Sequence, residues 1–129
     1  IADILKEKMG LTKKENFISV RKGILKPETL SREERARLIR ENPAYGNIIC
    51  RCEMITEGEI IDAIRRPLGA KSLDGVKRRT RAGMGRCQAG FCSPRVMEIL
   101  ARERQVDISE ITKSGKGSKI VVGVNKDTL

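Results

Sequence analysis

The four cysteines of the chain stand in two close pairs, and paired thiols of this kind bind metals, form disulfides or act as nucleophiles. Cys50 and Cys52 have one residue between them in "CRC", and Cys87 and Cys92 have four between them in "CQAGFC". The 129 residues include no histidine, which is the usual partner of a cysteine nucleophile and a frequent co-ligand of zinc. Free thiols, two disulfides, an all-cysteine zinc site and an iron–sulfur cluster remain as interpretations.

The surroundings of the cysteines help to separate these interpretations. Free structural cysteines are usually scattered through apolar faces, whereas these are paired in polar segments, and disulfides require an oxidising compartment that nothing in the sequence indicates. Zinc accepts four thiolates, although neither pair has the two-residue spacing common in zinc knuckles. An iron–sulfur cluster needs four thiolates in loops that wrap closely, and Gly83, Gly85 and Gly90 around the second pair suit that wrapping.

Positive charge near the cysteines would also suit an anionic cluster, because cations and helix N-termini stabilise it. Arg51 and Arg86 stand beside cysteines in the sequence and are candidates. The segment "VKRRTR" supplies further candidates, namely Lys77, Arg78, Arg79 and Arg81. The alternative for these four side chains is an ordinary solvated helix face opposite Val76 and Thr80.

Short helices are predicted to position the two pairs. Capping boxes at Ser31/Glu34 and Thr56/Glu59 predict helices over about 32–41 and from 57 until Pro67. Ser72 is predicted to cap a third helix that closes at Gly83, and Ser93 with Pro94 to begin a fourth. Their apolar arcs are Ile60, Ile61 and Ile64 in the second helix, Leu73 and Val76 (with Thr80) in the third, and Val96, Met97, Leu100 and Ala101 in the fourth. All four cysteines then lie on turns at helix ends, and antiparallel packing would bring both loops to the same end.

The predicted fold is mainly α: a small helical, helix-turn-helix-like domain with an aliphatic core, since the only aromatic residues are Phe17, Tyr45 and Phe91. We expect residues 1–47 to be a linker with short helices, including one over residues 1–9 and an extended piece over 17–20. Residues 48–106 form the cysteine-bearing domain. Residues 107–129 form a tail with a helical turn in "DISEIT" and a short strand in "KIVVGV".

Composition and charge limit the kinds of partner that the chain is expected to bind. The net charge of +10 is compatible with a polyanionic partner, but the positive charges are spread out and almost no aromatic rings are interleaved with them. Nucleic acid is therefore not expected as a partner. No apolar run reaches the roughly 20 residues that span a bilayer, so no transmembrane segment is expected. The chain starts without methionine or a signal sequence, which favours a piece of a longer cytoplasmic protein.

The motifs C-R-C-E, T-E-G-E, T-R-A-G-M-G-R-C-Q and F-C-S-P-R stand in order over residues 48–103. This segment resembles the bacterioferritin-associated-ferredoxin-like (BFD-like) domain, a small helical fold that binds a 2Fe-2S cluster. More closely, it resembles the version at the C-terminal end of FAD-dependent, anaerobic-type glycerol-3-phosphate dehydrogenases. The resemblance implies that Cys50, Cys52, Cys87 and Cys92 are the cluster ligands.

The resemblance further implies a role for the chain. An upstream FAD domain would oxidise the substrate, and the cluster would relay electrons one at a time to an acceptor protein, either separate or part of the same enzyme. The fragment would hold no catalytic residue and be inactive alone, and any association with a membrane would come through partner subunits. A zinc-stapled interaction module, with zinc held by the same four cysteines, stays open as the alternative, as does a basic nucleic-acid-binding module.

Overall fold

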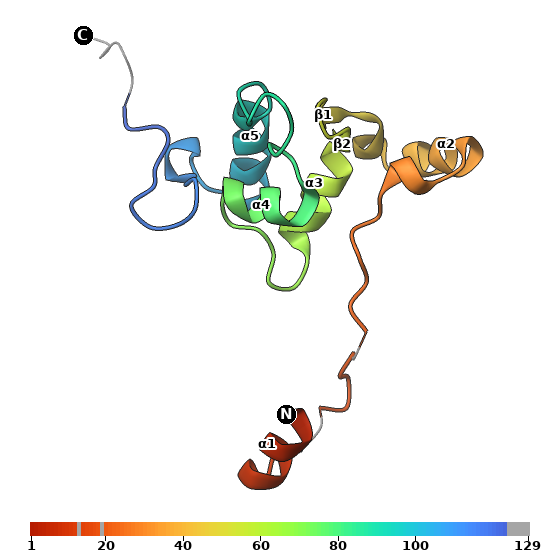
Figure 1. Cartoon of the computed structure of the whole chain (residues 1–129), viewed down its shortest axis with the longest axis vertical. Coiled ribbons are helices and arrows are strands. Elements are labelled where there is room, and N and C mark those ends of the chain that lie inside the picture. The colour runs from red at the N-terminus through yellow and green to blue at the C-terminus, as the bar shows by residue number, and fades with distance from the viewer. Residues whose placement is uncertain (13, 19, 124–129) are drawn as a thin grey trace.

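The structure is a computed structural model that describes residues 1–12, 14–18 and 20–123 (Figure 1). Helices dominate it, as predicted. The α-helices are α1 (Ala2–Met9), α2 (Arg32–Glu41), α3 (Glu57–Arg65), α4 (Leu73–Thr80) and α5 (Ser93–Arg104). The short 3-10 helices are η1 (Pro27–Thr29), η2 (Pro43–Gly46) and η3 (Ile108–Glu110), and the strands are β1 (Ile48–Cys50) and β2 (Ile55–Thr56).

Both predicted capping boxes are present. At the start of α2 the Ser31 side chain accepts from the Glu34 N–H, and the Glu34 carboxylate accepts from the Ser31 N–H at 2.9 Å. At the start of α3 the Glu59 carboxylate accepts from the N–H and the hydroxyl of Thr56, both at 2.8 Å. The second box is buried, so it fixes the first turn of α3 against the core as well as capping it.

The ends of α4 and α5 differ in detail from the sequence prediction. Ser72 caps α4 as expected, but α4 ends at Thr80 and its C-cap is Arg81 in a left-handed conformation (φ 72°), before Gly83 is reached. The N-cap of α5 is Cys92, and Ser93 is already helical. Ser93 as N-cap was therefore wrong by one residue, because the turn that carries Cys92 supplies the first helical carbonyl, to the Val96 N–H.

A two-stranded hairpin, not foreseen from the sequence, carries the first cysteine pair. β1 and β2 run antiparallel, with Ile48 opposite Thr56 and Cys50 opposite Ile55, and the register is irregular between Ile48 and Cys50. The unequal spacing leaves residues 51–54 in a tight turn, in which Met54 has a positive φ of 53°. Cys50 therefore ends a strand, whereas Cys52 lies on the turn.

The core lies between α3, α4 and α5 and is aliphatic, as the composition predicted. Its buried members are Cys50, Ile55, Ile60, Ala70, Val76, Ala82, Cys92, Val96, Met97, Ile99, Leu100 and Ile111. The predicted arcs of all three helices contribute, and Ile99 joins them although the sequence pattern did not single it out. Tyr45 is buried apart from this cluster, where its ring packs on Gly58 and its hydroxyl donates to Asp62 at 2.7 Å. This contact ties η2 to α3.

At the two ends of the chain, the predicted helical segments are present, and the predicted extended segments form no strand among the described residues. The N-terminal helix is present as α1, but none of its residues is buried, and Figure 1 shows it separated from the other helices by an extended segment. No strand forms among the described residues of 17–20, and residue 19 lies outside them. The turn in "DISEIT" is present as η3. The tail strand was wrong: over 119–123 the structure has only an isolated bridge between Thr112 and Lys119, and residue 124 lies outside the described part.

Candidate metal centre

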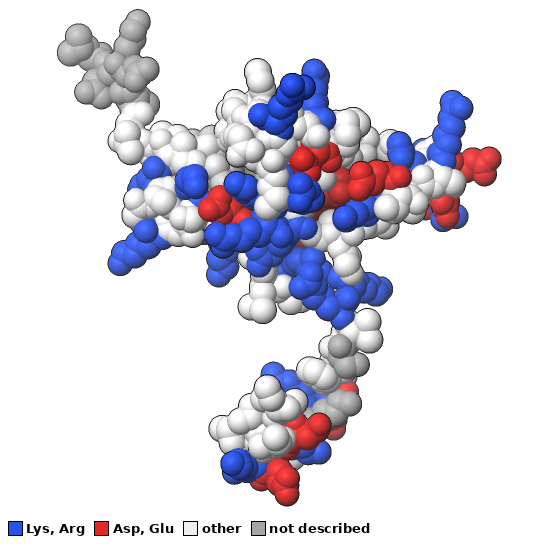
Figure 2. All heavy atoms as spheres, viewed as in Figure 1, with Lys and Arg blue, Asp and Glu red and all other residues white. Residues whose placement is uncertain are grey.

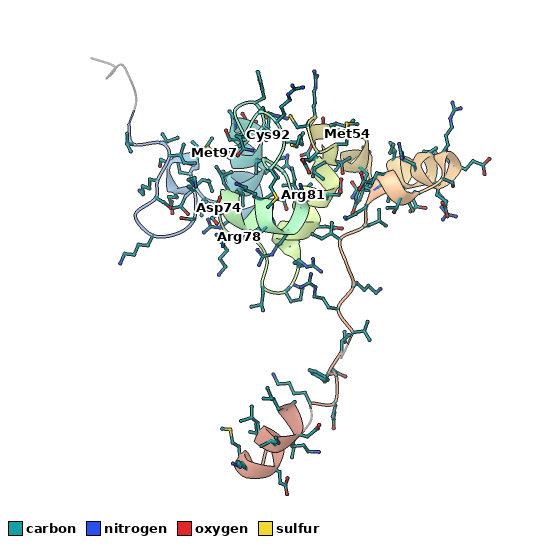
Figure 3. The ribbon with its side chains drawn as sticks, in the orientation of Figure 1. Met54, Asp74, Arg78, Arg81, Cys92 and Met97 are labelled. Atoms are coloured by element: carbon teal, nitrogen blue, oxygen red, sulfur yellow. The ribbon has the colours of Figure 1, made fainter. Side chains whose placement is uncertain are left out.

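All four cysteines line one cavity of about 480 Å³. They come from two loops that meet at the same end of the helices, as the sequence analysis expected. The other described residues that line the cavity are Asn47, Ile48, Ile49, Arg51, Phe91 and Arg95. In Figure 3, Cys92 at the start of α5 and Met54 in the hairpin turn mark these two loops on the same side of the domain.

The cysteines differ in exposure, and each loop supplies one buried and one more accessible thiol. Cys50 is 1% exposed and Cys92 is 3% exposed, so both belong to the hydrophobic core. Cys52 is exposed and Cys87 is partly exposed. The cavity thus has a buried inner side and an outer side open to solvent.

The second loop is a series of tight turns. Arg81, Gly83, Gln88 and Ala89 all have positive φ angles, and only glycine adopts such a backbone without strain. The Gln88 amide group, on the surface, donates to the carbonyls of Met84 and Gly85 and so stabilises these turns. These turns bring Cys87 back toward Cys92.

The two loops touch at Gly85 and Cys52. A Cβ added to Gly85 would lie 2.3 Å from the Cβ of Cys52, a distance that real Cβ atoms essentially never show. Close by, Arg81 and Glu53 form an ion pair with 2.6 Å between Nε and Oε2. Gly85 was expected to help the loop wrap, and the structure gives the reason: the backbone must approach the Cys52 side chain.

The two cysteines of the second loop, Cys87 and Cys92, differ in acidity. The Phe91 backbone N–H, followed by the Cys52 thiol, holds the pKa of Cys87 below its usual value. Burial, together with smaller contributions from the neighbouring thiols of Cys50 and Cys87, raises the pKa of Cys92 to about 11. The outer cysteine Cys87 therefore loses its proton at a lower pH than Cys92 does.

The electrostatic surroundings of the cavity favour an anionic group. Arg51 and Arg95 are among its described lining residues, and no carboxylate is. The positive end of the α5 macrodipole faces the cavity, because Cys92 is the N-cap of that helix. Arg95 was not singled out from the sequence, and its position one turn inside a helix that starts at a cysteine was the signal that could have identified it.

The other predicted cations lie elsewhere. Arg86 is exposed and does not line the cavity. Within the segment "VKRRTR", Arg78 is 3.8 Å from Asp74, Arg79 donates to the Gly75 and Leu68 carbonyls, and Arg81 pairs with Glu53. Figure 2 shows Lys and Arg side chains gathered over α4 and the loop before it. For this helix the alternative of a solvated basic face describes the structure better than direct contact with the cavity.

The donor set fits a thiolate-ligated cofactor. Four sulfur atoms from Cys50, Cys52, Cys87 and Cys92 border one cavity, and the cavity adds cations and a helix N-terminus. In the described part of the chain, no three Cys, Asp or Glu side chains converge closely enough to hold a single metal ion. Nor does any described helix have the length and apolarity needed to cross a membrane.

Comparison with known proteins agrees with this geometry. Residues 48–102 match the model of the BFD-like [2Fe-2S] binding domain. Over 130 aligned residues the chain is 54% identical to a glycerol 3-phosphate dehydrogenase of Caloramator mitchellensis, covering all of this chain and 27% of that protein. It is 39% identical over 62 residues to one subunit of the anaerobic glycerol-3-phosphate dehydrogenase of Escherichia coli K12, covering 48% of this chain and 11% of that protein.

A third relative carries a different activity in its name. The HcnB subunit of the hydrogen cyanide synthase of Pseudomonas aeruginosa is 44% identical over 59 residues, covering 43% of this chain and 12% of HcnB. No solved structure matches the chain significantly. The chain spans about a quarter or less of the length of these relatives, so the comparison concerns only part of each of them. Residues 48–102 belong to the BFD-like [2Fe-2S] binding domain family, and the chain as a whole resembles the corresponding part of glycerol-3-phosphate dehydrogenases.

Proposed function

We propose that this chain is the electron-transfer part of an FAD-dependent glycerol-3-phosphate dehydrogenase, in which Cys50, Cys52, Cys87 and Cys92 hold a 2Fe-2S cluster. The observation that carries the proposal is that two distant loops bring these four cysteines to one cavity, in a domain of the BFD-like family. The end-to-end similarity to a named glycerol 3-phosphate dehydrogenase supports the choice of parent enzyme over the cyanide-forming relative, which matches a shorter part of the chain.

The pairing of the thiols supports a two-iron cluster over a zinc ion. Cys50 and Cys92 are both buried and Cys52 and Cys87 are both more accessible, so the cysteines form an inner and an outer pair around one cavity. In a four-cysteine 2Fe-2S cluster each iron takes two thiolates, whereas a single zinc ion would draw all four sulfurs to one point. When bound, the cluster supplies reversible one-electron transfer, which would link a two-electron flavin to a one-electron acceptor.

The protein's own residues divide the remaining work. Cys50 and Cys92 are buried among aliphatic side chains, so they would exclude water from the inner half of the site. Arg51, Arg95 and the N-terminus of α5 would offset the negative charge of the ligated group. Cys52 and Cys87 lie toward solvent and would form the side at which electrons are exchanged.

The rim of the cavity indicates the kind of acceptor. Phe91, between two of the cysteines, is 87% exposed. Arg51 and Arg86 are exposed and form no ion pair with any other described residue. An apolar side chain with cations nearby would suit an acceptor whose docking face combines an apolar centre with carboxylates. The upstream FAD domain would be the donor.

Two measurements test this function. The chain purified anaerobically should show the visible absorption of a 2Fe-2S cluster, with iron and acid-labile sulfide in equal amounts. Stoichiometric zinc without sulfide, in protein made with ample iron, would contradict the cluster and support the zinc-stapled module instead.

The second measurement uses the full-length enzyme. Cys87→Ala should lose or labilise the cluster and abolish turnover with the natural acceptor, while substrate still reduces the flavin in stopped-flow experiments. Ser93→Ala is a matched control, because Ser93 adjoins Cys92 but its side chain does not cap the helix. Parent-like acceptor turnover in a Cys87→Ala enzyme without cluster would show that the cluster is only structural.

A further inference from the structure

The two cysteine loops are joined by one ion pair. Glu53 directly follows Cys52, and its Oε2 lies 2.6 Å from Nε of Arg81. Arg81 is the residue at which α4 ends and the second loop begins, and it is labelled in Figure 3. The pair therefore connects the turn that carries Cys52 with the start of the loop that carries Cys87.

The backbone of Arg81 is fixed by two hydrogen bonds, so the ion pair can hold the turn that carries Glu53 in place. The Arg81 N–H donates to the Lys77 carbonyl at 2.8 Å, and its own carbonyl accepts from the Met84 N–H at 2.9 Å. Arg81 thus belongs to the last turn of α4 and to the first turn of the loop at once. Glu53 lies between the irregular end of β1 and β2.

The Glu53 side chain also packs against the second loop. Its carboxyl-bearing end is 3.3 Å from the place where a Gly85 Cβ would be, and the same position is 2.3 Å from the Cys52 Cβ. The Glu53 side chain is 19% exposed, compared with 63% for Arg81. The carboxylate is therefore held between Gly85 and Arg81, next to the outer cysteine of its own loop.

We propose that Glu53 and Arg81 are positioning residues that hold Cys52 opposite Cys87 in the outer half of the metal centre. The inner pair, Cys50 and Cys92, needs no positioning residues, because both side chains are packed in the hydrophobic core. The outer pair lacks that packing, and the ion pair with the close contact at Gly85 replaces it. This inference rests on the proposed function and adds two residues that are not ligands.

The ion pair also has an electrostatic consequence for the site. Glu53 places a carboxylate beside a centre that would itself be anionic, and Arg81 neutralises it. Removing Arg81 alone leaves that charge unpaired next to the cluster, whereas removing both charges does not. Comparing the single and the double variant therefore separates two effects: the loss of the ion pair that joins the loops, and the unpaired negative charge beside the cluster.

The test compares Arg81→Gln, Arg81→Lys and the double variant Glu53→Gln/Arg81→Gln in the cluster-loaded chain. Cluster loss to a chelator, followed by visible absorption, should be about five-fold faster in Arg81→Gln, as expected for one partly exposed ion pair. The double variant should lose its cluster as fast, and Arg81→Lys should partly restore the parent rate because it keeps the charge. The reduction potential should fall in Arg81→Gln and return toward the parent value in the double variant.

Arg78→Gln is the matched control. Arg78 is exposed like Arg81 and lies 3.8 Å from Asp74, but both residues of this pair lie on α4, so the pair joins no loops. Arg78 does not line the cysteine cavity, and Arg78→Gln should leave the rate of cluster loss unchanged. The EPR spectrum of the reduced cluster should broaden in both Arg81→Gln and the double variant and stay narrow in Arg78→Gln, and thermal unfolding of all variants should be alike.

A metal-free measurement completes the test. In the chain without metal, mild oxidation with diamide should join Cys52 to Cys87, and this disulfide should form more slowly in Arg81→Gln and in the double variant. Parent rates of cross-linking and of cluster loss in both would overturn the positioning role. A parent chain without a 2Fe-2S spectrum would contradict the proposed function instead, and the cross-linking rates would still decide the role of the pair.

Discussion

Without metal, Cys87 should react with an alkylating reagent much faster than Cys92. The reactive species is the thiolate. Burial raises the pKa of Cys92 from an ordinary 9.0 to about 11, which at neutral pH makes its thiolate about 100-fold rarer than that of an ordinary cysteine. The pKa of Cys87 is shifted the other way, and its thiol is only partly covered. Because the thiolate of a less acidic thiol is also more nucleophilic, acidity alone gives an expected ratio of alkylation rates of at least about 10, and the burial of Cys92 increases it.

The assay is pulsed alkylation with iodoacetamide under anaerobic conditions, followed by digestion and mass spectrometry of the cysteine peptides. The same reaction in concentrated guanidinium gives the rate of each thiol without structure, and there the four rates should agree closely. The ratio of folded to unfolded rate then isolates the effect of the fold at each position. This ratio should be far smaller for Cys92 than for Cys87.

The result that would refute this reasoning is equal alkylation of Cys87 and Cys92 in the folded chain. It would mean that the start of α5 opens easily without metal, so that the buried inner side of the cavity does not exist before the cofactor arrives. Slow alkylation of Cys92 that speeds up only when the pH is raised toward 11 would instead support the assigned acidity.

Three further outcomes are expected for the metal-free chain, each measured by chemical or thermal unfolding. Because the folded pKa of Cys92 is raised above 9.0 to about 11, its contribution to stability is complete below about pH 9 and is lost as the pH rises through 11; Cys92→Ala should decline less steeply over that range. Gly58→Ala should destabilise by about 1–3 kcal/mol, since the new Cβ would lie 2.6 Å from the Tyr45 ring, whereas Gly23→Ala meets no atom within 4 Å and should be neutral. Leu100→Ala, at a fully buried position, should cost about 2–5 kcal/mol, and a loss below about 1 kcal/mol would contradict the assigned core.

Features set by neighbouring residues could be predicted from the sequence. The capping boxes at Ser31 and Thr56 need only a hydroxyl and a carboxylate three residues apart, and both formed as expected. The meeting of the cysteine loops was foreseen because short helices joined by short turns pack antiparallel. The ligand set itself stays a prediction, since it came from the family resemblance.

Features set by distant residues could not be predicted. The hairpin of β1 and β2 contains strands of three and two residues, which are too short to show a period. "KIVVGV" has the composition of a strand, but the described part of the tail finds no strand to pair with. The pairing of Glu53 with Arg81 links residues 28 positions apart, and no local pattern marks it.

The order of events during synthesis follows from where the paired cysteines lie in the chain. Cys50 and Cys92 are about forty residues apart, and bringing the ends of so long a loop together costs about 3 kcal/mol of chain entropy. Their meeting depends on α3 and α5, which pack together only after the last of these helices has been made. While α5 is still inside the ribosome, Cys50 and Cys52 have already been made but cannot yet contact the cysteines of the second loop. Insertion of the cofactor must therefore be one of the last steps in the maturation of this domain, and the exposed half of the site is where the cofactor would enter.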